Sequence, residues 1–219
     1  MHKYFAQVLV LLSACAHTLT YTPCEADSAR QAKRSQELQD LVNADQADRT
    51  GPVEKIDMEA VRPRDIRRRI RVAEIFAEGC FKEAKDYAAA ALVFQHGDVV
   101  DHYYQTFIWS KRAVELGDPT QRSMMAKGLD RYLVRTGKKQ LFASQAGKDS
   151  PNPCWCLEPV EKSFPESRRA EYGSRSNAEA FLWVQGLNAE QSDCPKETKP
   201  SFCNHPLKPS PKGSVPGFW

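Results

Sequence analysis

The chain has 219 residues, a length that suits one domain with appendages or two small domains. Hydrophobic residues make up 41% of the chain, which is enough for a core, and charged residues make up 27%, which indicates a solvated surface. The formal net charge is only +3, so composition alone indicates neither a nucleic acid nor another acidic partner.

Residues 1–16 have the pattern of a secretory signal peptide. His2 and Lys3 precede an apolar run over residues 4–12, which is shorter than the roughly 20 residues that a transmembrane helix needs. We therefore exclude residues 1–16 from the fold and interpret residues 17–29 as a polar tether. A cytosolic protein with an apolar start is the alternative.

The end of this signal resembles the lipobox of bacterial lipoproteins, on the residues Leu12-Ser13-Ala14-Cys15. In that family the cysteine thiol receives a diacylglyceryl group and becomes the mature N-terminus, so Cys15 is the candidate lipidation site. Ala16 stands where an aspartate would favour the inner membrane, and the resemblance therefore implies the periplasmic face of the outer membrane. Ordinary cleavage after Ala16 also fits the residues and stays open.

Six cysteines remain once Cys15 is set aside, and an even number in an exported chain predicts disulfides. The candidates are Cys24, Cys80, Cys154, Cys156, Cys194 and Cys203. Zinc is the competing use, but Cys154 and Cys156 have one residue between them where zinc knuckles commonly have two.

The spacing of these cysteines also suggests pairings. We expect Cys194 and Cys203 to close a short loop, because the proline-rich segment around them has little apolar content. Cys154 and Cys156 should not pair with each other, since one intervening residue makes a strained ring. We expect them to reach distant thiols such as Cys80, with Cys24 left as the thiol that could stay free.

Apolar spacing and breakers predict helices at about 28–42, 64–78, 82–96, 99–116 and 119–136. In the helix expected at 64–78, Arg62-Pro63 should mark the beginning. An apolar stripe of this helix should face the core, formed by Ile66, Ile70, Ala73 and Ala77 and widened by Ile75 and Phe76. Its six arginines between 62 and 71 should then lie on the wet face, with Asp65 and Glu74 as counter-charges. No aromatic residues are interleaved with them, which argues against nucleic acid.

Two glycine–aspartate joints connect the last three of these helices. Gly97-Asp98 and Gly117-Asp118-Pro119 place a glycine where a left-handed residue ends a helix and an aspartate where the next helix needs a cap. Pro119 suits the first turn of the following helix. Both joints predict antiparallel neighbours.

After Gly137 the character of the sequence changes. Residues 154–160 read as extended, and Ser176-Asn177-Ala178-Glu179 has the spacing of a capping box that starts a helix to about residue 187. Six prolines from Cys194 onward exclude regular helix or sheet there.

These observations predict a mostly α fold of antiparallel helical hairpins with an irregular, disulfide-stabilised C-terminal extension. The expected division is a signal peptide at 1–16, a tether at 17–29, a helical domain at 30–147, an extension with a short helix at 148–192 and a proline-rich tail at 193–219.

Two resemblances attach to the helical part. Ala-Val-Glu-Leu-Gly-Asp at 113–118 resembles the end of a Sel1-like or tetratricopeptide repeat, which implies a scaffold of helical hairpins. Residues 35–172 resemble a bacterial helical family of unknown function, whose fourth motif commonly ends Gly-Thr-Gln where this chain has Ala143-Ser144-Gln145. The motifs are Asp45-Gln46-x-x-Arg49, Phe94-Gln95-His96-Gly97-Asp98, Leu129-Asp130-Arg131, Gly137-Lys138-Lys139-Gln140-x-Phe142-x-x-Gln145 and Leu157-x-Pro159-Val160. This resemblance implies a helical fold and no established activity.

The same motifs contain the candidate site residues. His96 is a possible acid or base, and the side chains that could orient a polar substrate are Asp130, Arg131, Gln140 and Gln145. A structural interpretation competes with this, because a histidine cation at a helix C-terminus is favoured by the helix dipole. Asp130 and Arg131 are adjacent, so their side chains should point in different directions.

A metal interpretation would use Asp98, Asp101 and His102, which share one helix face. Helix capping accounts better for the two aspartates, and Asp45 and Arg49 read as solvated residues at a helix end. We therefore expect neither a metal nor a cofactor.

Two functions remain for this chain. The preferred one is a lipid-anchored, non-catalytic cell-envelope protein that binds a protein or peptide through its hairpins, with no nucleic acid. The alternative is a small hydrolase-like or ligand-binding pocket around His96, Asp130, Arg131 and Gln145, which requires those side chains to converge on a concave site that solvent reaches.

Overall fold

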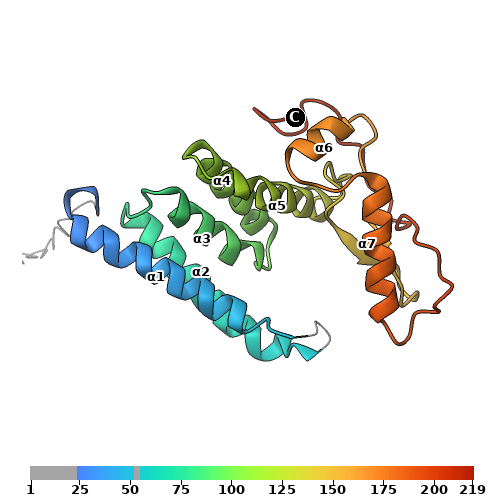
Figure 1. The fold of residues 1–219 in the computed structure, drawn as a ribbon, viewed down its shortest axis with the longest axis horizontal. Helices are drawn as coiled ribbons and strands as arrows, with labels where there is room; N and C mark the ends of the chain where they lie inside the picture. The colour runs from blue at the N-terminus through green and yellow to red at the C-terminus, as the bar shows by residue number, and fades with distance from the viewer. Residues whose placement is uncertain (1–23, 52–54) are drawn as a thin grey trace, which may run out of the picture.

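The computed structural model describes residues 24–51 and 55–219, and it confirms a mostly α fold (Figure 1). The helices are α1 (Ser28–Ala47), α2 (Met58–Ala77), α3 (Ala84–Gln95), α4 (Val100–Glu115), α5 (Arg122–Arg135), α6 (Glu166–Glu171) and α7 (Asn177–Glu190). Strands β1 (Ala146–Lys148) and β2 (Trp155–Leu157) pair antiparallel. The expected signal peptide and Cys15 lie outside the described residues. Among the described residues, no helix has the length and apolar character to cross a membrane.

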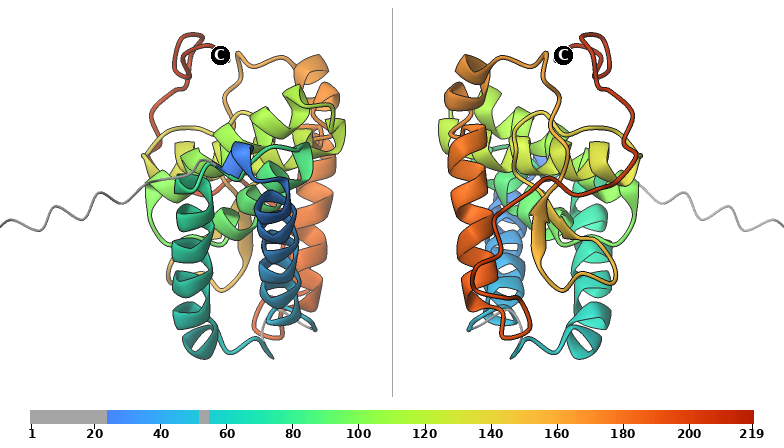
Figure 2. Two further views of the ribbon diagram at one scale, coloured as in Figure 1. Left: turned by 90° about the vertical axis from the view of Figure 1, so that its left-hand side faces the viewer. Right: turned by 90° about the vertical axis from the view of Figure 1, so that its right-hand side faces the viewer.

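The helices are arranged as successive hairpins. Short turns join α3 to α4 and α4 to α5, and α3 also packs against both α1 and α2. The sheet, α6 and α7 form the other end of the molecule (Figures 1 and 2). The apolar cores follow this division, with one among α1, α2 and α3, one under α5 and one between the sheet and α7.

The joint between α4 and α5 has the predicted chemistry. Gly117 is left-handed, with a φ of 100°, and the Asp118 carboxylate accepts a hydrogen bond from the Thr120 N–H at 3.1 Å. Pro119 begins the short 3-10 helix Pro119–Gln121 that leads into α5.

The joint between α3 and α4 differs from the prediction. Gly97 is not left-handed; it is needed because a Cβ there would lie 2.4 Å from the Cβ of His102. Asp98 does not cap α4, whose N-cap is Val99 without a side-chain bond. The Asp98 carboxylate instead pairs with Arg69 at 3.0 Å, because Arg69 reaches this joint from α2.

Helix α2 starts earlier than predicted, and the side of the helix that is buried differs from the predicted side. Asp57 caps it by accepting from the Ala60 N–H at 3.0 Å, and Pro63 lies inside the helix. The predicted core stripe was wrong for Ile66, Ile70 and Phe76, which are 40%, 55% and 49% exposed, and right for Ile75, which is buried. The buried residues of α2 are Val61, Asp65, Arg68, Arg69, Val72 and Ile75.

Ion pairs between α1 and α2 explain this orientation. Both helices offer charges of both signs at this contact, and arginines of α2 find carboxylate partners on the α1 side. The pairs are Arg71–Glu37 at 2.5 Å, Arg34–Glu78 at 2.7 Å, Arg49–Asp65 at 2.6 Å, Arg64–Asp48 at 2.8 Å and Arg68–Asp48. Asp65 and Glu74 are counter-charges as predicted, with Arg68 and Arg71.

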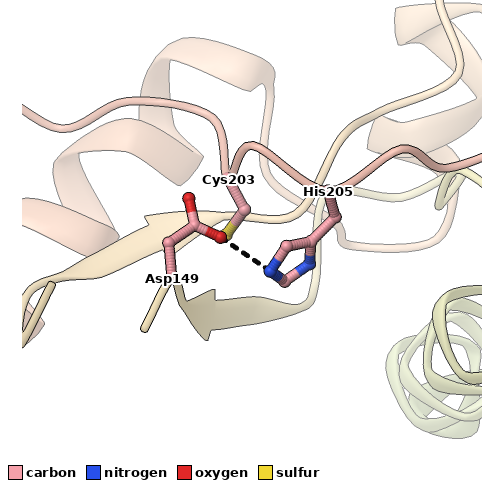
Figure 3. Close-up of side chains that lie close together, drawn as sticks. All are labelled: Asp149, Cys203 and His205. Atoms are coloured by element: carbon pink, nitrogen blue, oxygen red, sulfur yellow. Dashed lines mark ion pairs between the residues drawn. The ribbon is translucent and has the colours of Figure 1, made fainter. Parts of the chain in front are cut away.

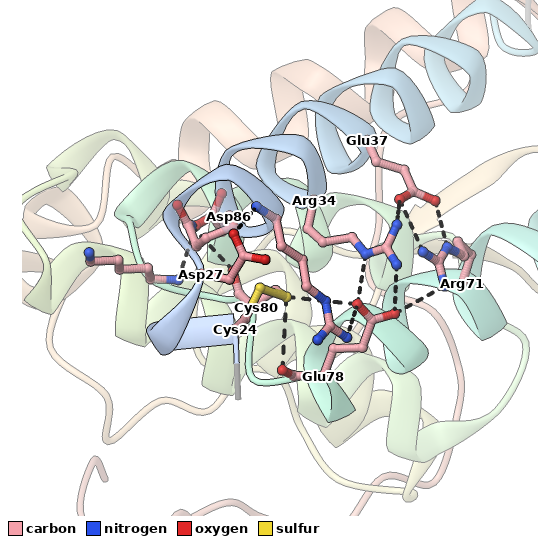
Figure 4. Close-up of a disulfide and its surroundings, with 11 residues drawn as sticks. Cys24, Asp27, Arg34, Glu37, Arg71, Glu78, Cys80 and Asp86 are labelled. Atoms are coloured by element: carbon pink, nitrogen blue, oxygen red, sulfur yellow. Dashed lines mark hydrogen bonds and ion pairs between the residues drawn. A yellow bond between two sulfur atoms is a disulfide. The ribbon is translucent and has the colours of Figure 1, made fainter. Parts of the chain in front are cut away.

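A disulfide between Cys24 and Cys80 ties the beginning of the described chain to the end of α2 (Figure 4). Its neighbours in that view include Arg34 and Glu78, so the covalent link lies at one end of the ion-pair network. The expectation of a polar tether to residue 29 was wrong for the described part, because Cys24–Ala26 is a 3-10 helix and Cys24 is fully buried.

The other two disulfides are Cys154–Cys194 and Cys156–Cys203, so the predicted Cys194–Cys203 loop was wrong. Cys154 and Cys156 avoid each other as predicted. The tail runs along β2, where the Cys203 N–H donates to the Leu157 carbonyl at 2.8 Å, and this places Cys203 beside Cys156.

The tail also joins the apolar core under α5, contrary to the prediction from its composition. Val215 is buried, and Trp219 packs edge-on against Phe164 with ring centroids 4.9 Å apart. Phe218 contacts Phe142 in the same cluster. Three apolar side chains are enough here because the body supplies a matching aromatic surface.

Replacing Asp118 tests the joint between α4 and α5. Asp118→Ala should lower the free energy of unfolding by about 1 kcal/mol, because the Thr120 N–H loses its acceptor. Asp118→Asn keeps an acceptor and should cost only a few tenths of that. Chemical denaturation measures both, and equal losses in the two variants would contradict the cap.

Replacing Cys194 tests the disulfide pairing. Cys194→Ser should release one thiol, on Cys154, and destabilise the fold by about 2–4 kcal/mol. Thiol labelling and peptide mapping without reduction locate the free cysteine. A label on Cys203 in this variant would show that the pairing is wrong.

Candidate functional site

A cleft of about 810 Å³ separates the helical body from the C-terminal extension. The body contributes Arg49, Met58, His96, Gly97, Tyr103, Arg131, Val134 and Arg135. The extension contributes Gln145, Ala146, Gly147, Lys148, Trp155, Glu158 and His205. Three predicted site residues, His96, Arg131 and Gln145, therefore converge on one concave surface that solvent reaches.

His96 and Asp45 form a dyad at the body wall of this cleft. The His96 Nδ1 lies 2.8 Å from the Asp45 Oδ2, and the Asp45 side chain is 0% exposed while that of His96 is 26% exposed. Arg49 and Gln46 also donate to this carboxylate, at 3.0 and 2.8 Å, so its position is set from two further directions. The interpretation of Asp45 and Arg49 as solvated residues was wrong, because α2 and α3 cover the end of α1.

The dyad determines which nitrogen of His96 is available. A carboxylate is an acceptor of hydrogen bonds, so the Nδ1 is the donor of this pair and the Nε2 faces away from Asp45. Within residues 24–51 and 55–219, no side chain or backbone group bonds to that Nε2. His96 caps the C-terminus of α3 as predicted, and Arg69 donates to its backbone carbonyl at 3.1 Å.

Arg131 is largely buried and lacks a carboxylate partner in the described chain. Its Nη1 donates to the Gln95 carbonyl at 2.6 Å and its Nε donates to the Gln145 Oε1 at 3.1 Å. The guanidinium lies 5.4 Å from the centre of the Tyr103 ring. Burial lowers the pKa of Arg131, and the like charge of Arg135 lowers that pKa further. An anion in the cleft would offset both effects.

Three more cations line the cleft: Arg49, which pairs with Asp45 and Asp65, and Arg135 and Lys148. Arg135 follows Arg131 by one helical turn and forms no ion pair with any described residue. Lys148 comes from the opposite wall, where its Nζ donates to the Gln191 Oε1 at 2.9 Å and lies 5.2 Å from the Trp155 ring centre. The body wall of the cleft is therefore basic, and the extension wall carries both Lys148 and Glu158.

Asp130 and Gln140 support the site from behind and do not line it. Asp130 is fully buried and accepts from the backbone N–H groups of Leu141, Phe142 and Ser144, at 2.8, 3.0 and 3.0 Å. Burial raises the pKa of Asp130 to about 6, and those hydrogen bonds act against the rise. As predicted, Asp130 and Arg131 point in different directions.

The loop whose backbone N–H groups bond to Asp130 ends at Gln145. Gln140 forms two further hydrogen bonds to the end of this loop. The Gln145 N–H donates to the Gln140 Oε1 at 2.8 Å, and the Gln140 Nε2 donates to the Gln145 carbonyl at 3.0 Å. Ala143 in this loop is left-handed, with a φ of 55°. This conformation is one that glycine adopts at the lowest cost.

His205 closes the far end of the cleft and had no signal in the sequence. Its two ring nitrogens lie 2.7 Å from Asp149 and 3.1 Å from Glu158. Burial raises the pKa of Glu158, an effect that the neighbouring His205 reduces. Asp149, Cys203 and His205 cluster like metal ligands (Figure 3), but the Cys203 sulfur is bonded to Cys156 and offers no thiolate.

The metal interpretation at the joint between α3 and α4 gains nothing from the structure. Asp98 pairs with Arg69, and His102 lies 3.2 Å from Asp98 with its pKa lowered chiefly by burial.

No family model, curated protein or solved structure matches this chain. The geometry of the cleft is therefore the basis for a functional conclusion.

The ion pairs behind the cleft predict an acid sensitivity. Arg64, and after it Arg68, hold the pKa of the Asp48 carboxyl at about 2, below its usual 3.8. Since the folded state has the lower pKa, this stabilisation is complete above about pH 4 and is lost as the pH falls toward about 2. Asp48→Asn should therefore be less stable than the wild type at pH 7 and should lose less stability between pH 4 and 2.

Urea denaturation at a series of pH values measures this effect. Asp40→Asn is the matched control, because Asp40 lies on α1, is exposed and bonds only to Gln36. If both variants follow the wild-type acid limb, the pairs with Asp48 do not stabilise the fold.

Proposed function

We propose that the cleft binds a small ligand that carries an anionic group, a phosphate or a carboxylate. The observation that carries this proposal is Arg131, a largely buried guanidinium in the cleft wall with no carboxylate partner in the described chain. A buried cation without a counter-charge is costly, so a site that keeps one favours a bound anion.

The surroundings of Arg131 support a specific site. The Gln95 carbonyl, the Gln145 amide and the Tyr103 ring orient the guanidinium, and a planar fork held in this way suits two oxygens of a carboxylate or phosphate. Met58, Val134 and Trp155 give the cleft apolar surface for the rest of the ligand.

Calorimetric titration of the protein with inorganic phosphate, and separately with succinate, tests this function. Arg131→Met should weaken the binding of the anion by about 10-fold or more, since a hydrogen bond to a charged group contributes roughly 1.5–3 kcal/mol. Arg122→Met is the matched control, because Arg122 begins the same helix but does not line the cleft. Equal affinity in wild type and Arg131→Met would overturn the proposal.

Binding of a protein or peptide is the second candidate, and the exposed side of α2 favours it. Ile66, Ile70 and Phe76 are 40%, 55% and 49% exposed on that helix. Such an apolar face is typical of an interaction surface.

We also propose that the chain is exported and anchored to the outer membrane through a lipid on Cys15. Three disulfides support an oxidising compartment, where such bonds persist. Intact-mass analysis of the mature protein tests the anchor, and a mature form that begins at His17 without lipid mass would contradict it.

A further inference from the structure

We propose that the Asp45–His96 dyad acts as the general base in the hydrolysis of a phosphate ester held by Arg131. This inference rests on the anion-binding function proposed above and names the chemistry of the same cleft. It follows from three features of the site: the free nitrogen of His96, its link through the backbone to Arg131, and the absence of serine, threonine and cysteine from the described cleft wall.

The first feature is the geometry of the dyad. The buried Asp45 carboxylate accepts from the Nδ1 of His96 at 2.8 Å, which directs the Nε2 lone pair away from Asp45. Asp45 is itself held by Arg49 and Gln46, so the ring has one orientation. A histidine held in this way takes a proton readily, because the carboxylate stabilises the imidazolium that forms.

The second feature is the link between the base and the anion site. Arg131 donates to the carbonyl of Gln95, the residue before His96, at 2.6 Å. Tyr103, which lies under the Arg131 guanidinium, donates from its hydroxyl to the carbonyl of Gly97, the residue after His96, at 2.8 Å. The imidazole and the guanidinium are thus fixed to the same short stretch of backbone.

The third feature selects the attacking group. Among the described residues that line the cleft there is no serine, threonine or cysteine, and the hydroxyl of Tyr103 is engaged by Gly97. An attack by a side-chain alcohol or thiol therefore has no candidate, and the nucleophile is a water molecule that the Nε2 of His96 deprotonates.

The donors around the dyad select phosphorus over a carbonyl carbon. Acyl transfer commonly uses backbone N–H groups for the oxyanion, but here the Gly97 N–H donates to the Phe94 carbonyl and the Gln145 N–H donates to the Gln140 side chain. The charge at the reacting centre must then be met by the guanidinium groups of Arg131 and Arg135. Arginines in such a role suit the anionic oxygens of a phosphoryl group.

The step balances without a redox partner. The water oxygen forms a bond to phosphorus while its proton passes to the Nε2 of His96, and the phosphorus–oxygen bond to the leaving group breaks. The leaving oxygen then takes a proton from the imidazolium or from solvent. One water is consumed, and the products are an alcohol and a phosphate with one ester bond fewer. His96 is the catalytic residue, and Asp45 is a positioning residue that acts through it.

The test uses the full chain with its disulfides formed and three probes: p-nitrophenyl phosphate, bis(p-nitrophenyl) phosphate and p-nitrophenyl acetate. The wild type should hydrolyse one or both phosphate esters. His96→Asn should lower kcat by at least about 100-fold, the usual range for losing a general base, with KM changed less than about two-fold. Asp45→Asn should also lower kcat with little change in KM, whereas Arg131→Met should raise KM.

Three controls keep the result clear. His102→Asn removes a histidine of α4 that does not line the cleft and should keep the wild-type kcat. Circular dichroism and thermal unfolding check that each variant folds. His96 is partly exposed, so its replacement should disturb the fold less than replacement of the buried Asp45. If Asp45→Asn unfolds, His96→Asn therefore decides the test. Phosphate titration of His96→Asn should give the wild-type affinity.

Each other outcome overturns the inference in its own way. If phosphate binding depends on Arg131 but neither phosphate ester is hydrolysed, the hydrolytic step is wrong and the binding function stands. If p-nitrophenyl acetate is the only probe hydrolysed, the phosphate class is wrong. If His96→Asn keeps kcat, the dyad is not the base. If phosphate and succinate both fail to bind, the proposed function itself fails.

Discussion

Paired charges of both signs hold α1 against α2, in addition to an apolar cluster that includes Leu38, Val72 and Ile75. Arg71 and Arg68 of α2 pair with Glu37 and with Asp48 at the end of α1, and Arg49 pairs in the opposite sense with Asp65 of α2. Removing one partner of a buried pair leaves the other charge without compensation, which commonly costs about 3–5 kcal/mol. The network therefore specifies one orientation of α2, although apolar side chains of that helix are left in solvent.

The same network creates the body wall of the cleft. Asp45 sits at its inner end, where Arg49 joins it to Asp65 and leaves one carboxylate oxygen for His96. Arg69 reaches across to Asp98 and to the carbonyl of His96, so the end of α3 is tied to α2 as well. The orientation of the imidazole is thus a consequence of how α1 and α2 pair.

The opposite wall is held by different forces. Asp130 accepts hydrogen bonds from the backbone of the loop that ends at Gln145. Gln140 bonds both to that loop and to the Glu158 carbonyl. The disulfide Cys156–Cys203 joins β2 to the tail. The aromatic cluster of the tail, with Trp219 on Phe164, covers the loop from outside. The two walls are also joined, since Arg131 of α5 bonds to Gln145 on the extension side. Ligand sites that are fixed in this way by the fold are the usual condition for specific binding.

Sequence by itself determined the local features: the mostly α fold, the cap at Asp118, the capping box at Ser176 and the placement of His96 at a helix end. These depend on residues a few positions apart, whose hydrogen bonds form within one turn of the chain. It also brought out His96, Arg131 and Gln145 as site residues. Only the tertiary structure decided which face of α2 is buried, which cysteines pair, and that Asp45 stands behind His96. Each of these depends on partners distant in the sequence, and the periodicity of Ile66 and Ile70 cannot show that Glu37 and Asp48 lie on the α1 side as partners for arginines of α2.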